Sequence, residues 1–335
     1  MKKVICIGSA TRDIFVYLKE TKIIDNRQDI TAKRLMAFEL GAKEYASGFY
    51  EEVGGSAVNV GAGLVKAEIK SFVFSRVSKG EDGLWITKKI GKFKIKKNYL
   101  QKTGGEKSET SVIIADEKNR NHVILRTGDS VDNFDLEKAI RRFREKVDWL
   151  FIASQKRSWQ AKMKLAIEFA KNKKAKIAFN PSSYQIKNSP NELADLMPAL
   201  EIIFVNRDEA IELIKNVKGK VEDDMKYLLK ELKDLGVKIA VITDGEKGAY
   251  VTDGSEDLML KAKLIGRNDT VGAGDAFSSG FLAGYIENED ISRSLAWGIA
   301  NSAGVVSRPG ATNGLLKKKE LKKQEIELIN QIKRI

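Results

Sequence analysis

Cysteine and histidine are almost absent from this chain of 335 residues. The one cysteine, Cys6, lies in the apolar run near the start, so a disulfide framework is excluded and a buried thiol is expected. His122 is the only histidine, which leaves a Ser-His-Asp triad or a histidine-based metal site without the residues it needs. We expect His122 simply to occupy a strand.

Long apolar runs are absent as well. No stretch reaches 18 apolar residues, and the start Met-Lys-Lys-Val-Ile-Cys-Ile-Gly lacks the pattern of a cleaved signal peptide. With 42% hydrophobic residues and no internal repeat or linker, the chain can bury one substantial core. We therefore expect a cytoplasmic protein with a single domain over residues 1–335 and no membrane partner.

Two common nucleotide-binding loops are missing. The chain has no Gly-x-x-x-x-Gly-Lys-Ser/Thr segment, and its first predicted strand leads into Gly8-Ser9-Ala10 instead of Gly-x-Gly-x-x-Gly. The sequence therefore disfavours P-loop and dinucleotide-binding proteins.

Positive charge is abundant, with a formal net charge of +13. The lysine clusters fall on or beside predicted amphipathic helices and contain few aromatic residues to stack on bases, so solvated helix faces explain them better than a nucleic-acid site. The clusters are Lys88–Lys97, Lys171–Lys176 and Lys317–Lys323. We expect no nucleic-acid partner, and the positive field would favour anionic ligands such as nucleotides.

Apolar runs of strand length alternate with stretches of helical periodicity. This order is typical of an α/β protein whose mainly parallel sheet is covered on both faces. The predicted strands are Val4–Ile7, Ser71–Arg76, Trp149–Ile152, Lys176–Phe179, Ile202–Val205, Lys238–Thr243 and Ala249–Val251. The predicted helices are Ala57–Lys66, Gly83–Ile90, Leu136–Val147, Ala161–Lys171, Asp208–Lys215, Glu222–Leu235, Ala276–Ile286, Ser292–Ser307 and a basic C-terminal helix near Lys318–Ile332.

Four further strands have no helix between them. They are Ile14–Lys19, Arg34–Leu40, Thr110–Asp116 and His122–Thr127, the last two joined by the turn Glu117–Asn121. They predict a small second sheet from residues 14–40 and 110–127. The alternative is an antiparallel edge of the main sheet.

One glycine-rich turn, Asp269-Thr-Val-Gly-Ala-Gly-Asp275-Ala-Phe, combines the parts of a phosphoryl-transfer site. The backbone N–H groups of Gly272, Ala273 and Gly274 can converge on an anion, and the helix predicted to follow adds its positive end. Asp275 is placed to accept a proton from an attacking hydroxyl. The alternative is a loop in which Asp275 merely caps the helix.

This turn resembles the C-terminal signature of the ribokinase-like (PfkB) family of carbohydrate kinases, Asp-Thr-x-Gly-Ala-Gly-Asp-x-Phe. Residues 54–61, Gly-Gly-Ser-Ala-Val-Asn-Val-Gly, are similar to the family's first signature, Gly-Gly-x-x-x-Asn. The resemblance extends from Val4 to about Gly314. It implies a three-layer α/β/α ribokinase-like fold that uses ATP and Mg²⁺, with the small sheet as a lid over the acceptor site and often as a homodimer interface.

The resemblance also implies which residues bind the acceptor. Asp13 matches the aspartate that accepts hydrogen bonds from substrate hydroxyls, Gly54 and Gly55 allow a close approach, and Asn59 follows one turn later. Ser56 completes the set. Taken alone, Asp13 would be a turn residue and Ser56 a helix cap.

For the phosphoryl donor, residues 243–248, Thr-Asp-Gly-Glu-Lys-Gly, resemble the family's nucleotide-binding turn, although a plain hairpin would contain the same glycines. The nucleotide-binding residues implied are Thr243, Gly245, Gly248, Asn206 and Thr270.

Metal sites follow from the same resemblance. Asn206-Arg-Asp-Glu209 matches an Asn-x-x-Glu motif whose glutamate positions Mg²⁺ and its waters, and it also has the spacing of a capping box. Asn180-Pro181 is placed near the acceptor or these waters. Asp269, Val271 and residues 307–311 match the segments that bind a monovalent cation such as K⁺.

The sequence thus predicts an ATP-dependent sugar kinase that transfers the γ-phosphoryl group to a primary hydroxyl of a ribose-like or other small sugar. Ser56 disfavours an acceptor that is already phosphorylated, because phosphosugar kinases of the family tend to have a cation there. A nucleoside kinase of the same family and a non-catalytic nucleotide-binding relative are the alternatives.

Overall fold

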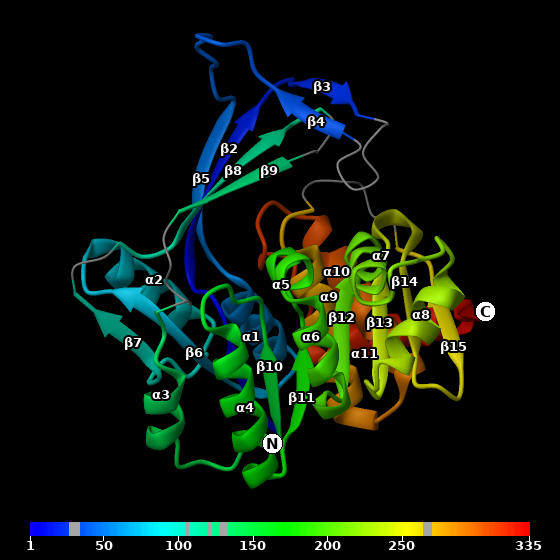
Figure 1. Ribbon diagram of the computed structural model, residues 1–335. Helices are drawn as coiled ribbons and strands as arrows, with labels where there is room; N and C mark the ends of the chain where they lie inside the picture. Colours follow the sequence, from blue (N-terminus) through cyan, green and yellow to red (C-terminus); the bar gives the residue numbers. More distant parts are fainter. Residues whose placement is uncertain (27–33, 105–106, 119–121, 128–132, 264–269) are drawn as a thin grey trace.

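The computed structural model describes residues 1–26, 34–104, 107–118, 122–127, 133–263 and 270–335. Within these ranges, one sheet has ten strands in the order β16-β15-β14-β13-β12-β11-β10-β1-β6-β7 (Figure 1). The strands from β7 to β13 run parallel, and β14, β15 and β16 form an antiparallel edge. Their bounds are β1 (Lys3–Ile7), β6 (Lys70–Ser78), β7 (Leu100–Thr103), β10 (Trp149–Ile152), β11 (Lys176–Phe179), β12 (Ile202–Asn206), β13 (Ile239–Thr243), β14 (Ala249–Thr252), β15 (Asp257–Leu260) and β16 (Lys333–Arg334).

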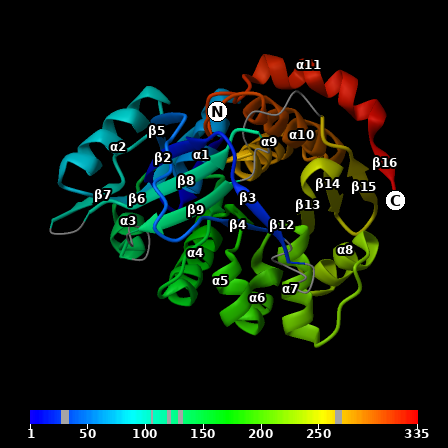
Figure 2. The same cartoon turned by 90° about the horizontal axis from the view of Figure 1, so that it is seen from above.

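Helices cover both faces of this sheet, as Figure 2 shows from above. Because side chains alternate along a strand, Val4 and Cys6 of β1 enter one core while Ile5 and Ile7 enter the other. The first core is closed by α1 (Ser56–Lys66), α2 (Glu81–Lys92), α9 (Ala273–Asn288), α10 (Ile291–Val306) and α11 (Lys318–Leu328). The second is closed by α3 (Leu136–Arg142), α4 (Trp159–Lys173), α5 (Ser183–Asn188), α6 (Pro190–Leu196), α7 (Arg207–Lys218) and α8 (Met225–Asp234). The predicted three-layer α/β/α class is confirmed.

Several predicted bounds were wrong. The helix expected to reach Val147 ends at Arg142, where Phe143 turns to an extended backbone and its ring enters the second core. The C-terminal helix ends at Leu328, and the chain continues through a short 3-10 turn, Ile329–Gln331, into β16. The short elements α5, α6, β7 and β15 were not predicted.

The small sheet is separate from the main one, so the alternative of an antiparallel edge was wrong. We call it the lid, and its strand order is β5-β2-β8-β9, with β2 (Thr11–Leu18), β5 (Gly48–Gly54), β8 (Thr110–Asp116) and β9 (His122–Thr127). The predicted strand Arg34–Leu40 does not belong to it. β4 (Arg34–Ala37) pairs with β3 (Lys22–Asp25) in a two-stranded ribbon. The unpredicted β5 takes its place, and three residues of the turn 117–121 lie outside the described residues.

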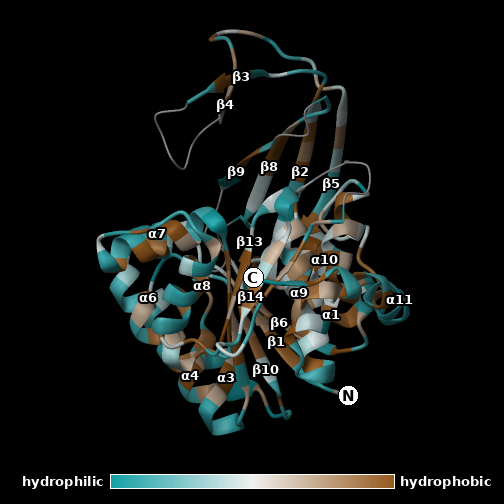
Figure 3. Cartoon of the chain, turned by 90° about the vertical axis from the view of Figure 1, so that its right-hand side faces the viewer, coloured by the Kyte–Doolittle hydropathy of each residue, from teal (hydrophilic) through white to brown (hydrophobic). Residues whose placement is uncertain are grey.

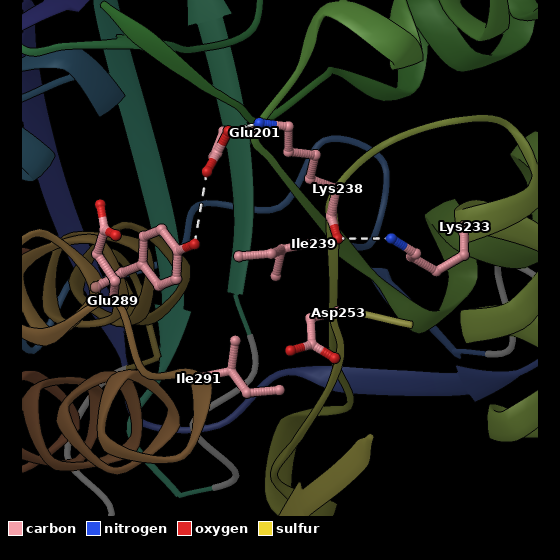
Figure 4. A pocket seen from close by; sticks show the side chains of 8 residues that line it. Glu201, Lys233, Lys238, Ile239, Asp253, Glu289 and Ile291 are labelled. Carbon is pink, nitrogen blue, oxygen red and sulfur yellow. Dashed lines mark hydrogen bonds and ion pairs between the residues drawn. The ribbon is translucent and has the colours of Figure 1, made fainter. Parts of the chain in front are cut away.

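An ion network around the buried Glu201 holds the amino-terminal edge of the main sheet, and Figure 4 shows Glu201 there beside Lys238. Glu201, which precedes β12 and whose side chain is 8% exposed, pairs with Lys176 at 3.0 Å and with Lys238 at 2.9 Å. Tyr285 of α9 donates to Glu201 at 3.5 Å. Lys176 also pairs with Glu289, directly after α9, at 2.9 Å. The network therefore fixes the C-terminal end of α9 against the sheet.

Polar residues cover the outer faces of the helices, while the strands between them are largely hydrophobic (Figure 3). The three lysine clusters lie on or directly beside α2, α4 and α11, as expected. In the described parts of the chain, no helix is both long and apolar enough to cross a membrane.

Candidate active site

The predicted site residues gather at the carboxyl ends of the parallel strands, beneath the lid. β1 lies between β6 and β10, so the strand order of the sheet reverses at β1. In open α/β sheets, ligands bind in the crevice outside the carboxyl ends of the strands at such a point. Asp13 follows β1, Asn206 ends β12 and Thr243 ends β13. Residues from distant parts of the sequence therefore meet at one edge of the sheet.

The glycine-rich turn forms the entry to α9. Gly272 is the N-cap with φ 79°, a left-handed conformation that favours glycine, and an added Cβ would lie 2.5 Å from the Cβ of Ala311. The helix begins at Ala273, so the alternative in which Asp275 caps it was wrong: Asp275 is the third helical residue. Gly274 is exposed, and among the described residues outside its own helix backbone and its chain neighbours no atom lies within 4 Å of a Cβ built on it. The first amides of α9 thus border open space.

The two signatures meet through hydrogen bonds to Asp275. Asn59 of α1 donates from Nδ2 to Oδ2 of Asp275 at 2.8 Å. Asn59 is itself 5% exposed, and its Oδ1 has no partner among the described residues. Burial raises the pKa of the Asp275 carboxyl, and hydrogen bonds from Asn59 and Ser56 together with the charge of Arg126 oppose that rise. The sequence did not predict this contact.

Asp13 is also held in a buried environment. Thr11 donates to its Oδ1 at 2.6 Å, and Ser111 of β8 is a second hydrogen-bond partner. Burial raises its pKa to about 6. Gly54 is required beside it, because a Cβ there would lie 1.8 Å from Oδ2 of Asp13. Asp13 and Gly54, Gly55, Ser56 and Asn59 of the first signature therefore lie together.

A cavity of about 710 Å³ adjoins the glycine-rich turn. Its lining includes four of the predicted nucleotide-binding residues, together with two residues of the turn: Thr243, Gly245, Gly248, Thr270, Ala273 and Gly274. Its apolar wall was not predicted and comes from α9 and α10: Phe277, Ile299, Ala303 and Val306. A volume of this size and a wall of this kind suit a nucleotide with a planar base.

Asn206 lies next to this cavity through strand register, since it pairs with Thr243 across β12 and β13. The capping box is confirmed: Asn206 Oδ1 accepts from the Glu209 amide at 2.8 Å, and Glu209 Oε2 accepts from the Asn206 amide at 3.0 Å. Burial raises the pKa of Glu209. Asn180 donates to the Phe204 carbonyl at 2.8 Å, so its side-chain amide holds the strand end.

The segments expected to bind a monovalent cation are partly described. Val271 is buried against Phe15 and Ile113 of the lid, and Gly272 contacts Ala311 of the segment 307–311. Asp269 lies outside the described residues. In the described ranges, no three His, Cys, Asp or Glu side chains cluster in a way that would hold a metal ion.

Two lid residues on β9 contact the body of the protein. His122 occupies a strand as expected, but its Nδ1 also lies 3.2 Å from Oγ1 of Thr270. Arg126 forms an ion pair with Glu109 and lies 3.4 Å from Oγ of Ser9. The spacing of four in a strand puts both side chains on one face, a signal in the sequence that we did not use.

Comparison with known proteins agrees with this geometry. The family model of the pfkB family carbohydrate kinase matches residues 1–318. An ATP-dependent 6-phosphofructokinase of Thermoanaerobacterium thermosaccharolyticum is 24% identical over 302 residues, which cover 86% of this chain and 90% of that protein. The adenosine kinase of Sinorhizobium meliloti matches in structure with a TM-score of 0.77 and 20% identity, covering 96% of this chain and 99% of the other. The ribokinase of Cryptococcus neoformans var. grubii serotype A in complex with ADP matches with a TM-score of 0.76 and 17% identity, covering 97% of this chain and 100% of the other.

These matches and the two signatures lead to one conclusion. The chain belongs to the pfkB family of carbohydrate kinases and has the ribokinase fold.

Proposed function

We propose that the protein transfers the γ-phosphoryl group of ATP to a primary hydroxyl of a ribose-like or other small sugar. The observation that carries this proposal is the 2.8 Å hydrogen bond from Asn59 to Asp275. It joins the predicted acceptor-binding helix to the predicted proton acceptor, beside a cavity of about 710 Å³. The acceptor hydroxyl and the phosphoryl group would thus meet at the entry to α9.

In the proposed reaction, Asp275 takes the proton of the attacking hydroxyl as the oxygen bonds to phosphorus and the bond to ADP breaks. The amides at Gly272, Ala273 and Gly274 stabilise the charge on the equatorial phosphoryl oxygens. The Asp275 carboxylate is a weak base, so it contributes mainly by orienting the hydroxyl until that group becomes acidic late in transfer.

Mg²⁺ fits this site as an ion held mainly by phosphates and water, because it needs few protein carboxylates. When bound, it supplies positive charge to the phosphate oxygens. Glu209 would hold one of its waters, since one of its oxygens accepts from the amide of Asn206, the residue that pairs with Thr243 at the end of the strands. Val271, Asp269 and residues 307–311 would hold K⁺. Titrating K⁺ into a buffer free of K⁺ and Na⁺ tests this assignment, which a flat rate would refute.

A nucleoside acceptor is the second candidate. Tyr50 is partly exposed and stacks on the buried Phe15, with ring centroids 4.4 Å apart, on the lid face that carries Asp13, so a base could pack against the Tyr50 ring. The match to an adenosine kinase in fold is compatible with this choice. A non-catalytic role is disfavoured, because Asp275, the turn glycines and Glu209 are all present.

The proposal includes a homodimer through the lid. The outer face of the lid presents apolar side chains to solvent, with Phe49 65%, Leu125 51% and Val123 38% exposed. Covering such a face with a second copy would bury it. The molar mass of the protein by light scattering, with Phe49→Glu and Lys118→Glu compared, tests this arrangement, and a wild-type monomer would refute it.

The test of function is ADP release from MgATP with a panel of acceptors: ribose, fructose, other hexoses, 2-keto-3-deoxygluconate, adenosine, inosine and fructose 6-phosphate. We expect turnover with ribose or a similar unphosphorylated sugar. Turnover restricted to adenosine or inosine would favour the second candidate. No turnover with any member, while ATP still binds, would contradict the proposed activity on these substrates.

A further inference from the structure

The lid carries a polar row across its inner face. Strand register pairs Glu52 with Asp13, Asp13 with Ser111, and Ser111 with Arg126, so the row crosses β5, β2, β8 and β9 in turn. Side chains directly opposite one another in paired strands lie on the same face of a sheet. Because Asp13 faces the acceptor site, Arg126 ends the row on that side.

Contacts of Arg126 confirm the direction. Its Nη2 pairs with the carboxylate of Glu109, which is buried, and lies 3.4 Å from Oγ of Ser9. Ser9 is 4% exposed and follows β1 of the main sheet. Arg126 therefore reaches from the lid to the body.

The charged groups around Arg126 are mostly acidic. Asp13 of β2, Glu109 before β8 and Asp275 of α9 are the carboxylates whose charges interact here, and Glu52 lies farther along the row. Arg12, the neighbouring cation, alternates to the other face of β2, where it pairs with Glu51 at 2.8 Å and Asp82 at 2.6 Å. The charge of Arg126 lowers the pKa of both Asp13 and Asp275 against the effect of burial. Among the described residues, it is the one cation that acts on both carboxylates.

We propose that Arg126 is a positioning residue of the acceptor site, which extends across the lid sheet toward Asp13 and from the lid toward Asp275 of the body, and which holds both carboxylates in place. The change in kinetics that this proposal predicts rests on the proposed kinase function. The change that it predicts in the titration of Asp13 and Asp275 does not. Because the guanidinium is carried by β9, proton acceptance by Asp275 depends on where the lid lies. Lid position and chemistry are thereby coupled through one side chain.

The first experiment needs no substrate. Protein labelled with ¹³C at the aspartate carboxyl carbons is titrated by NMR, with Asp13→Asn and Asp275→Asn used to assign the two signals. We expect both signals to titrate at higher pH in Arg126→Gln than in wild type, and near the wild-type pH in Arg126→Lys. The control Lys118→Gln removes a lid cation that pairs with Glu20 at 2.9 Å on the exposed loop, and it should leave both signals in place. The proposal would be overturned if the signals of Asp13 and Asp275 titrate at the same pH in Arg126→Gln as in Lys118→Gln.

The second experiment measures the kinetic split with the best acceptor of the panel. Removal of the positive charge that interacts with Asp13 and Asp275 predicts that Arg126→Gln lowers kcat/KM for the acceptor about 10- to 100-fold, while KM for ATP stays within about twofold. Arg126→Lys should recover part of the loss. An equal rise of both KM values with an unmoved pH profile would mean that Arg126 only supports the lid. A wild type without turnover would contradict the kinase proposal, and the NMR titration would still decide the role of Arg126.

Discussion

Asn59→Ala is the most informative single substitution, because it breaks the 2.8 Å hydrogen bond between Asn59 of the first signature and Asp275 of the second. The Nδ2 of Asn59 donates to a carboxylate from a position that is 5% exposed, so water replaces this contact poorly. A hydrogen bond to a charged group contributes about 1.5–3 kcal/mol. If the bond orients Asp275 in the transition state, kcat/KM for the acceptor should fall by about 10- to 150-fold.

The sign of the pH effect follows from the same contact. Asn59 donates to the ionised form of Asp275 and so opposes the rise in pKa that burial causes. Without it the carboxyl holds its proton to a higher pH, and the acid limb of the kcat/KM profile should move to higher pH. Steady-state rates from pH 5 to 9 measure both effects.

The matched control is Asn216→Ala. Asn216 lies on α7, away from the site, and its side-chain amide donates to the Ile186 carbonyl at 3.2 Å. That variant should keep the wild-type profile. If kcat/KM of Asn59→Ala stays within twofold of that of the control and its acid limb does not move, the hydrogen bond does not orient Asp275 for the reaction.

Two further predictions concern stability. Asp13 has a pKa of about 6, above its value of about 3.9 in an unfolded chain, so folding binds a proton between these values and stability falls as pH rises through this window. Asp13→Asn should therefore be more stable than wild type by up to about 3 kcal/mol at pH 7.5, and this gain should vanish near pH 4. Urea denaturation at both pH values measures the gain. A gain that does not change with pH would contradict the argument that burial raises the pKa of Asp13. Glu201→Gln leaves Lys176 and Lys238 without their shared carboxylate and should lower the free energy of unfolding by about 1–3 kcal/mol. Glu137→Gln breaks only an exposed pair on α3 and should change it by less than about 0.5 kcal/mol, so equal losses in the two variants would refute the structural role of the network.

Much of the fold could be predicted because its strands are buried in a recognisable way. Trp149–Ile152 and Lys176–Phe179 have the predicted bounds, since a parallel strand covered on both faces is a short unbroken apolar run. β5 was missed because Phe49 and Tyr50 are followed by two glutamates, and only pairing with β2 makes this segment a strand. The segment Arg34–Leu40, which precedes β5 in the sequence, has a more regular strand pattern, but its strand β4 pairs with β3 outside the lid.

The site could be predicted where a role belongs to a short motif. The turn around Asp275 and the glycines at 54 and 55 are recognisable as local patterns. The apolar wall of the cavity was not, because Phe277 and Ile299 have the spacing of ordinary core residues. Arg126 escaped notice because its role comes from the register of four strands, which no local pattern encodes.

The most direct test of the central claim is a single-turnover measurement of acceptor phosphorylation by wild type and Asp275→Asn, with ATP affinity measured in parallel. If Asp275 accepts the proton, the rate constant should fall by about 10²- to 10⁴-fold while ATP binds within about twofold of wild type. A variant that phosphorylates the acceptor within about tenfold of the wild-type rate would contradict the assignment of Asp275, and with it the mechanism proposed for this site.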